Sequence, residues 1–139
     1  GHICFYSKKE KIIFTGDTLF SLGCGRVFEG TYSEMLRSLN KIKKLPNDTR
    51  IYCGHEYTKK NLDFCSEIEI NNHYLKEKKK WIESRIDKKG PTLPVTIEEE
   101  LNTNIFLRCD VSSVKKYLGM EHSLEVEIFK KLRDLKDSF

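Results

Sequence analysis

Two residues that could bind a metal each follow a short apolar run that ends in glycine. Asp17 follows residues 12–16, and His55 follows residues 51–54. Each run is typical of a buried strand, and strand ends are rigid enough to aim a carboxylate and an imidazole at one point. Open α/β folds often build their sites just outside such strand ends. The alternative is structural, with Asp17 beginning a turn and His55 capping a helix.

Asp17 and His55 cannot complete a metal site by themselves. A catalytic zinc needs at least three protein ligands, and a binuclear centre needs more. The four histidines supply no motif, because no two of them are spaced i, i+2 or i, i+4. For His2, which lies in an apparent strand, we expect a hydrogen-bonded structural role.

Four further residues could border a site at these strand ends or bind an anion. Arg26 follows a loop that contains two glycines, and Tyr57 lies two residues after His55. Arg133 and Lys136 are spaced i, i+3 on an amphipathic C-terminal segment, so their side chains point in similar directions. Lys136 falls near the apolar stripe, where its ammonium could extend to water or hold an anionic ligand.

The elements that must position these residues are αβ layers followed by helices, an α/β (α+β) chain. Alternation and turn residues predict strands at residues 3–6, 11–15 and 50–53, with a loop at 21–26. A helix begins at the capping box of Thr31 and Glu34. Beyond Tyr57 the patterns predict helices only, at residues 57–67, 72–88, after the capping box of Thr96 and Glu99, and 122–136. We therefore expect domains at residues 1–57 and 58–139, with a rigid proline link at 91–94.

Composition excludes several classes of function. The net charge of +4 is mild, so we expect no nucleic-acid partner. No run of about 18 apolar residues is present, so we expect no membrane span. The five cysteines form no C-x-x-C pair, which argues against a cysteine-rich zinc site and for the cytoplasm or another reducing compartment.

Several segments together resemble one enzyme family. They are residues 16–20 (Gly-Asp-Thr-Leu-Phe), 23–30 (Gly-Cys-Gly-Arg-Val-Phe-Glu-Gly), 52–58 (Tyr-Cys-Gly-His-Glu-Tyr-Thr), 91–94 (Pro-Thr-Leu-Pro) and 133–139 (Arg-Asp-Leu-Lys-Asp-Ser-Phe). In order and over nearly the whole chain, they resemble glyoxalase II, the hydroxyacylglutathione hydrolases of the metallo-β-lactamase superfamily. The first segment recurs across that superfamily, whereas the proline link and the C-terminal segment are specific to this branch.

The resemblance implies an αββα sandwich with two divalent metal ions, followed by a helical domain that helps to bind glutathione. Zinc is expected first, and the same ligand types also accept iron or manganese. Asp17 looks like the carboxylate that bridges the two ions and His55 like a terminal ligand, which makes both catalytic. The implied substrate-binding residues are Arg26, Phe28, Tyr57, Arg133 and Lys136. Phe28 stands where some members have tyrosine, so it would contribute by packing only.

The chain also departs from the family. The family's Thr-His-x-His-x-Asp-His and Gly-His-Thr motifs, which supply the other metal ligands, are absent, and His2 corresponds to a histidine that is not a ligand. We therefore expect this chain to be the second half of the enzyme, with a metal site that is partial or absent in this chain alone. A separate first half or a second copy of the chain is the expected protein partner.

Three functions follow as hypotheses. The first is hydrolysis of S-2-hydroxyacylglutathione thioesters, with S-D-lactoylglutathione as the typical small-molecule substrate. The second is a metal-poor, inactive fragment that acts as a binding module. The third is another enzyme of the same fold, such as a persulfide dioxygenase with a single iron, against which the helical tail with Arg133 and Lys136 argues.

Overall fold

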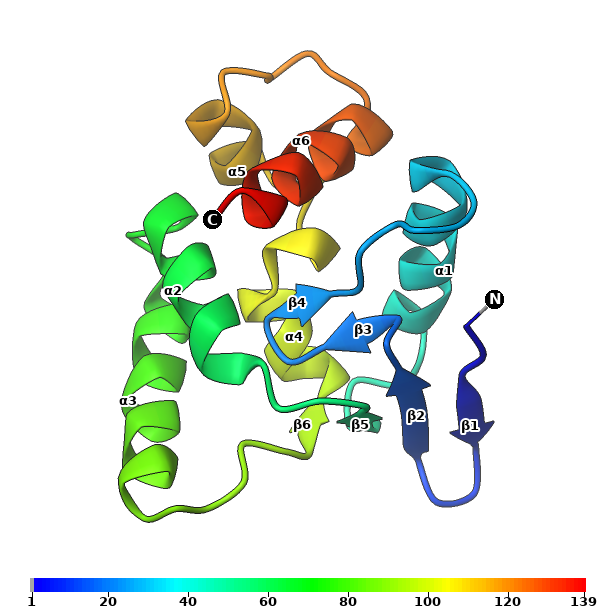
Figure 1. Cartoon of the computed structure of the whole chain (residues 1–139), viewed down its shortest axis with the longest axis vertical. Coiled ribbons are helices and arrows are strands. Elements are labelled where there is room, and N and C mark those ends of the chain that lie inside the picture. The colour runs from blue at the N-terminus through cyan, green and yellow to red at the C-terminus, as the bar shows by residue number, and fades with distance from the viewer. Residues whose placement is uncertain (1) are drawn as a thin grey trace.

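The computed structural model describes residues 2–139. The strands are β1 (Phe5–Ser7), β2 (Ile12–Gly16), β3 (Leu19–Phe20), β4 (Gly23–Cys24), β5 (Arg50–Cys53) and β6 (Val95–Thr96). The helices are α1 (Tyr32–Lys43), α2 (Thr58–Ile68), α3 (His73–Asp87), α4 (Ile97–Thr103), the 3-10 turn η1 (Ile105–Leu107), α5 (Ser112–Tyr117) and α6 (Glu125–Asp137). The mixed α/β class is thereby confirmed. In Figure 1 α2 and α3 lie on the left, the β3–β4 hairpin lies near the centre, and β1 and β2 lie at the lower right, below α1.

One four-stranded sheet brings the two predicted strand ends together. Its order is β1-β2-β5-β6, and β3 pairs with β4 in a separate hairpin. β2 and β5 run parallel, whereas the outer pairs are antiparallel. Parallel neighbours need a long crossover, and α1 lies in the connection between them. The carboxyl ends of β2 and β5 therefore meet at one edge of the sheet, beside the β3–β4 hairpin (Figure 1).

Local capping signals begin two of the helices as the sequence predicts. The Thr31 hydroxyl accepts the N–H of Glu34 at 3.1 Å, and the Glu34 carboxylate accepts the N–H of Thr31 at 2.7 Å. Thr96 and Glu99 form the same reciprocal pair ahead of α4. Such a cap is worth about 1 kcal/mol. Both helices thus begin where i, i+3 chemistry places them, independently of the rest of the fold.

Aromatic rings at the centre of the core join the helices to one another. Phe106 of η1 lies edge-on to Phe129 of α6, with ring centroids 6.0 Å apart, and stacks on Phe64 of α2 at 6.3 Å. All three side chains are buried. α6 also packs across α1. The C-terminal helix, far from α1 and α2 in sequence, is therefore fixed against both of them.

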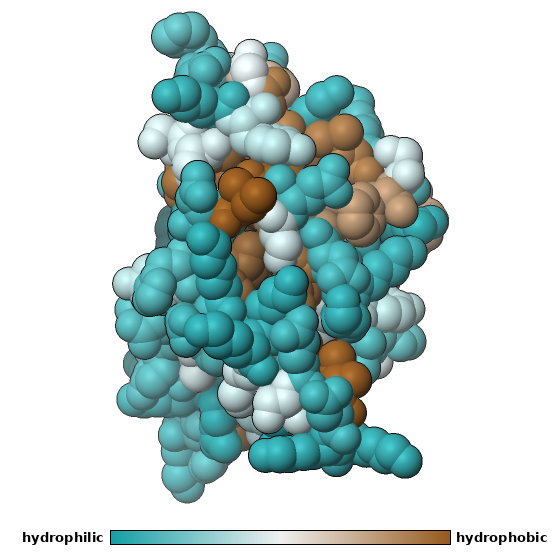
Figure 2. Space-filling model, turned by 90° about the vertical axis from the view of Figure 1, so that its left-hand side faces the viewer, coloured by the Kyte–Doolittle hydropathy of each residue, from teal (hydrophilic) through white to brown (hydrophobic). Residues whose placement is uncertain are grey.

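The surface combines a hydrophilic face with an apolar sheet face. Figure 2 shows the side on which α3 lies, where hydrophilic side chains dominate. On β1 and β2, Phe5 and Phe14 are 66% and 53% exposed. The prediction that the run at 12–16 is a buried strand is therefore wrong for one face of β2, because burial alternates along it and only Ile13 and Thr15 are buried. Among residues 2–139, no helix is long and apolar enough to cross a membrane.

Three short elements differ from the sequence predictions. Residues 21–26, predicted as a loop, contribute β4 to the β3–β4 hairpin. The expectation of helices only beyond Tyr57 is wrong, because β6 pairs with β5 through Ile51↔Val95 and Arg50↔Thr96. α5 was not predicted either. Elements of two to six residues are too short to show a periodicity, and tertiary pairing forms them. β6 lies beyond residue 57, so the two predicted domains share one sheet, and their boundary stays a prediction.

Candidate metal and ligand-binding site

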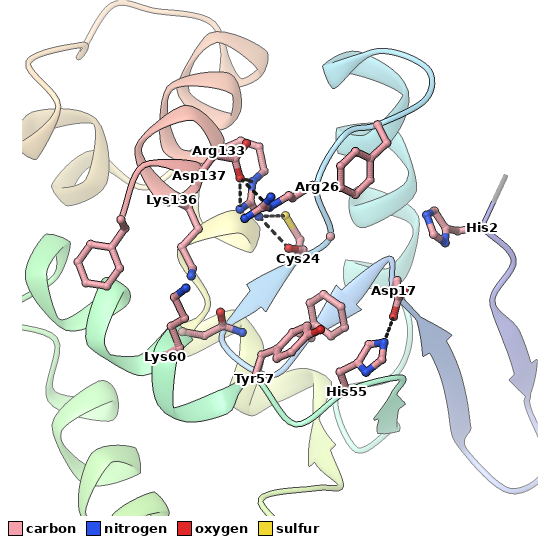
Figure 3. Close-up of a pocket in the computed structure, with 15 residues that line it drawn as sticks. His2, Asp17, Cys24, Arg26, His55, Tyr57, Lys60, Arg133, Lys136 and Asp137 are labelled. Carbon is pink, nitrogen blue, oxygen red and sulfur yellow. Dashed lines mark hydrogen bonds and ion pairs between the residues drawn. The ribbon is translucent and has the colours of Figure 1, made fainter.

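The sheet places Asp17 and His55 side by side. Residues Ile13 and Ile51 are paired on β2 and β5, and an irregularity then aligns Gly16 with Cys53. The two residues that follow lie at the same edge, with Asp17 Oδ1 3.3 Å from His55 Nε2 (Figure 3). The structure thus brings together the two side chains that the sequence singled out as metal ligands.

Two glycines allow this close approach. The Gly54 N–H donates to the Gly16 carbonyl at 2.8 Å, and a Cβ on Gly54 would lie 2.8 Å from Asp17 Oδ1. A Cβ on Gly25 would collide with the Asp17 carbonyl oxygen. Any larger residue at either position would therefore displace Asp17.

The donor set fits a shared metal ion as part of a larger site. A tetrahedral zinc with ligands about 2.1 Å away holds two ligand atoms about 3.4 Å apart. The observed 3.3 Å between Asp17 Oδ1 and His55 Nε2 matches this separation, and both side chains are about half exposed. In residues 2–139, however, no group of three or more His, Cys, Asp or Glu side chains could hold a metal. The pair therefore supplies two ligands and needs others.

A cavity of about 480 Å³ extends from this pair toward α6. Close to the pair its wall is aromatic: the His55 and Tyr57 rings stack with centroids 5.1 Å apart, and Phe20 lies edge-on to Tyr57 at 5.1 Å. The lining residues are His2, Asp17, Phe20, Cys24, Gly25, Arg26, Phe28, His55, Tyr57, Lys60, Asn61, Arg133, Lys136, Asp137 and Phe139. The cavity therefore has a ligand pair at one end and an aromatic wall beside it.

The far end of the cavity carries four cations, Arg26, Lys60, Arg133 and Lys136, which we call the cationic end. Of these, Arg133 is almost fully buried and its guanidinium is already bonded. It donates to the Cys24 carbonyl at 2.8 Å and to Asp137 Oδ1 at 2.7 and 3.1 Å, and it lies 5.1 Å from the centroid of the Phe106 ring. Arg133 thus joins α6 to β4, and through β4 it positions the wall of the cavity.

Lys136 is set differently from Arg133. Its ammonium lies 5.7 Å from the ring centroid of Phe64 and 5.8 Å from that of Phe139. Partial burial, with the positive charges of Lys60 and Arg133, lowers the pKa of Lys136 below that of an ordinary lysine. The Lys136 side chain lines the cavity, and its role in holding an anionic ligand stays a prediction.

Comparison with known proteins identifies the family. The family model described as the hydroxyacylglutathione hydrolase C-terminus matches residues 56–139, and the metallo-beta-lactamase superfamily model matches residues 1–55. The chain belongs to the hydroxyacylglutathione hydrolase family. The resemblance seen in the sequence is thereby confirmed.

Curated relatives match over the whole chain. Proteins named hydroxyacylglutathione hydrolase from Pelagibacter ubique, Maricaulis maris and Chelativorans sp. are 56%, 46% and 48% identical over 139 residues, which is 100% of this chain. The matched region is 52% of the first protein and 54% of the other two. The chain therefore spans about half the length of the curated relatives it matches.

In this member of the hydroxyacylglutathione hydrolase family, two residues of α4 and its C-terminal end anchor the β3–β4 hairpin by hydrogen bonds. The fully buried carboxylate of Glu100 accepts the N–H of Leu22 at 2.8 Å, which fixes the hairpin turn although Leu22 has a φ of +60°. The Asn104 side-chain amide donates to the carbonyls of Phe20 and Gly23. The hairpin that carries Phe20 and Cys24 into the cavity is therefore anchored by α4.

Glu56 anchors the segment that carries His55 and Tyr57. Its carboxylate accepts the N–H of Thr92 at 3.1 Å and the Thr92 hydroxyl, which also bonds to Thr58. The proline link at residues 91–94 thus supports the loop between β5 and α2. In sequence, Glu56 is an unremarkable neighbour of His55, and only the fold shows its partner.

All seven predicted site residues line the same cavity, although their burial and contacts differ. Asp17 and His55 form the ligand pair, and Tyr57 belongs to the aromatic wall. Phe28 lines the mouth and is 81% exposed. The sequence reading missed Phe20, Lys60 and Asp137. Lys60 could have been found, because it lies one helical turn after Tyr57 and shares its side of the helix.

Proposed function

We propose that the protein hydrolyses S-2-hydroxyacylglutathione thioesters, such as S-D-lactoylglutathione, to a hydroxy acid and glutathione. The observation that carries the proposal is the ligand pair at one end of a cavity whose other end is cationic. In a glutathione thioester, the reacting carbonyl lies at one end and the peptide carboxylates lie toward the other, so the carbonyl can reach the ligand pair while the carboxylates reach the cations. The names of the matched relatives support the same reaction.

Asp17 and His55 would hold metal in this reaction, with further ligands from outside the described residues. Carboxylate and imidazole suit zinc, and also iron or manganese. Bound divalent ions supply Lewis acidity and lower the pKa of water from about 15.7 toward 7. Two ions are proposed, and Asp17 and His55 would both help to hold them.

The chain's own residues would orient the substrate. The aromatic wall of Phe20 and Tyr57 would pack against the substrate beside the ligand pair, and the cationic end would bind the carboxylates of the glutathione part. Phe28, which has no hydroxyl, would contribute only by packing. We also propose the cytoplasm or another reducing compartment as the location, because the five cysteines form no C-x-x-C pair.

A specific observation favours one alternative for the chain by itself. Only two metal-ligand side chains converge within residues 2–139. If no other segment or second copy completes the site, the chain would be a metal-poor module that binds glutathione without hydrolysing its thioesters.

Replacing Asp17 by alanine in the full-length protein tests the proposal. We expect metal content to fall and kcat/KM for S-D-lactoylglutathione to drop by more than about 100-fold, because even residues that only orient metal ligands cost about 10–100-fold. Metal analysis and thioester absorbance provide the two readings. Asp63→Ala, at an exposed carboxylate of α2 paired with Lys59, is the matched control and should change neither. Near-normal turnover by Asp17→Ala would contradict the proposal.

A further inference from the structure

The four cations of the cationic end are not equally neutralised. Asp137 serves both arginines: its Oδ1 accepts hydrogen bonds from Arg133 and lies 3.6 Å from Arg26 Nε. Within residues 2–139, no carboxylate lies within ion-pair distance of Lys60 or Lys136. The uncompensated charge of the cavity therefore belongs to the two lysines.

Lys60 and Lys136 approach the same point from different helices. Figure 3 shows the Lys60 side chain rising from α2 and the Lys136 side chain descending from α6, with their ammonium groups facing one another. Both line the cavity. The neighbouring Lys59, by contrast, is paired with Asp63 on the outer surface of α2. The position of Lys60 on α2 thus points its side chain into the cavity, whereas the side chain of Lys59 points to the outer surface.

This arrangement is unfavourable without an anion. Like charges that face each other repel, and the rings of Phe64 and Phe139 shield the Lys136 ammonium from part of its water. The lowered pKa of Lys136 is consistent with both effects, since Lys60 is among its causes. A carboxylate between the two ammoniums would turn the repulsion into two charge-assisted hydrogen bonds.

We propose that Lys60 and Lys136 together clamp one carboxylate of the peptide part of the ligand, and that Lys60 is a specificity-determining residue for that charge. The identity of the ligand rests on the proposed function. Lysine suits this role because its ammonium is a compact charge on a flexible stem, so two of them can close on a carboxylate from opposite sides. Arg133 also positions this end of the cavity, because its guanidinium bonds to Cys24 of β4 and to Asp137.

The test measures binding rather than turnover, by titration calorimetry on the full-length protein. The probes are S-methylglutathione, a thioether that cannot be hydrolysed, and its diethyl ester, in which both carboxylates are blocked. Lys60→Met should weaken binding of the diacid about 10-fold, the loss of one charge-assisted hydrogen bond. Binding of the diester should be the same for Lys60→Met and the unsubstituted protein. Lys59→Met is the matched control and should bind the diacid normally.

Each result decides the proposal. Unchanged affinity of Lys60→Met for the diacid would overturn it, and so would an equal loss for diacid and diester, because Lys60 would then act by shape. Circular dichroism shows whether Lys60→Met folds. If it does not, Lys60→Gln replaces it in the same titrations. A protein that shows the expected pattern but does not hydrolyse S-D-lactoylglutathione would refute the proposed function and leave the clamp standing. Absence of S-methylglutathione binding by the unsubstituted protein would refute both.

Discussion

Replacing Arg133 by methionine should destabilise the fold strongly, because this side chain is a buried tie between α6 and β4. Methionine keeps the apolar stem and removes only the guanidinium. The buried Cys24 carbonyl then loses a charged donor at 2.8 Å, and Asp137 loses its partner at 2.7 Å. The cation–π contact with the Phe106 ring is lost as well.

The magnitude follows from these three contacts. A hydrogen bond from a charged donor is worth about 1.5–3 kcal/mol. A buried cation–π contact adds about 1–2 kcal/mol. The pair with Asp137, which is 39% exposed, adds at most about 1 kcal/mol. The free energy of unfolding should therefore fall by about 4 kcal/mol, a large fraction of the stability of a typical domain.

Urea unfolding followed by circular dichroism measures this loss. Lys130→Met is the matched control: Lys130 lies on the same helix and is paired with Asp134, but on the solvent side, so stability should barely change. A loss below about 1 kcal/mol for Arg133→Met, together with abolished S-methylglutathione binding, would refute the reasoning. In that case Arg133 would be a direct ligand contact rather than a structural tie.

Three further predictions concern the cavity and its surroundings. Gly25→Ala should lower the free energy of unfolding by about 2 kcal/mol in urea titrations, because the new Cβ collides with the Asp17 carbonyl; an unchanged midpoint would contradict the close packing. Burial raises the pKa of the Cys24 thiol to about 11 and that of the Cys65 thiol to about 12. Iodoacetamide at pH 8 should therefore leave both thiols of the native protein unmodified, as measured by mass spectrometry. Rapid labelling of either cysteine would contradict its burial. Between the lowered pKa of Lys136 and 10.5, the unliganded folded state binds fewer protons than the unfolded state, so this residue makes the free energy of unfolding rise with pH. Over the same pH range the affinity for S-methylglutathione should fall, because the Lys136 ammonium loses its charge. An affinity that does not change with pH would exclude Lys136 as a ligand contact.

Short-range sequence patterns predicted part of this fold. The capping boxes at Thr31 and Thr96 involve partners three residues apart, so neither depends on the rest of the chain. Helix periodicity located α6, and the apolar runs that end in glycine located β2 and β5. The ligand pair was also readable, because the residue after each parallel strand must lie at the same edge of the sheet.

By itself, then, the sequence determined the longer helices and where most of them begin, the strands β2 and β5, and that Asp17 and His55 belong together. Only the tertiary structure decided which charges of the cavity are free. Arg133 and Lys136 lie one helical turn apart in the sequence, yet Arg133 bonds to Cys24 and Asp137, whereas Lys136 has no such partner within residues 2–139 and faces Lys60. The physical reason is that charge pairing depends on distances between elements far apart in the chain, and no local pattern encodes those distances.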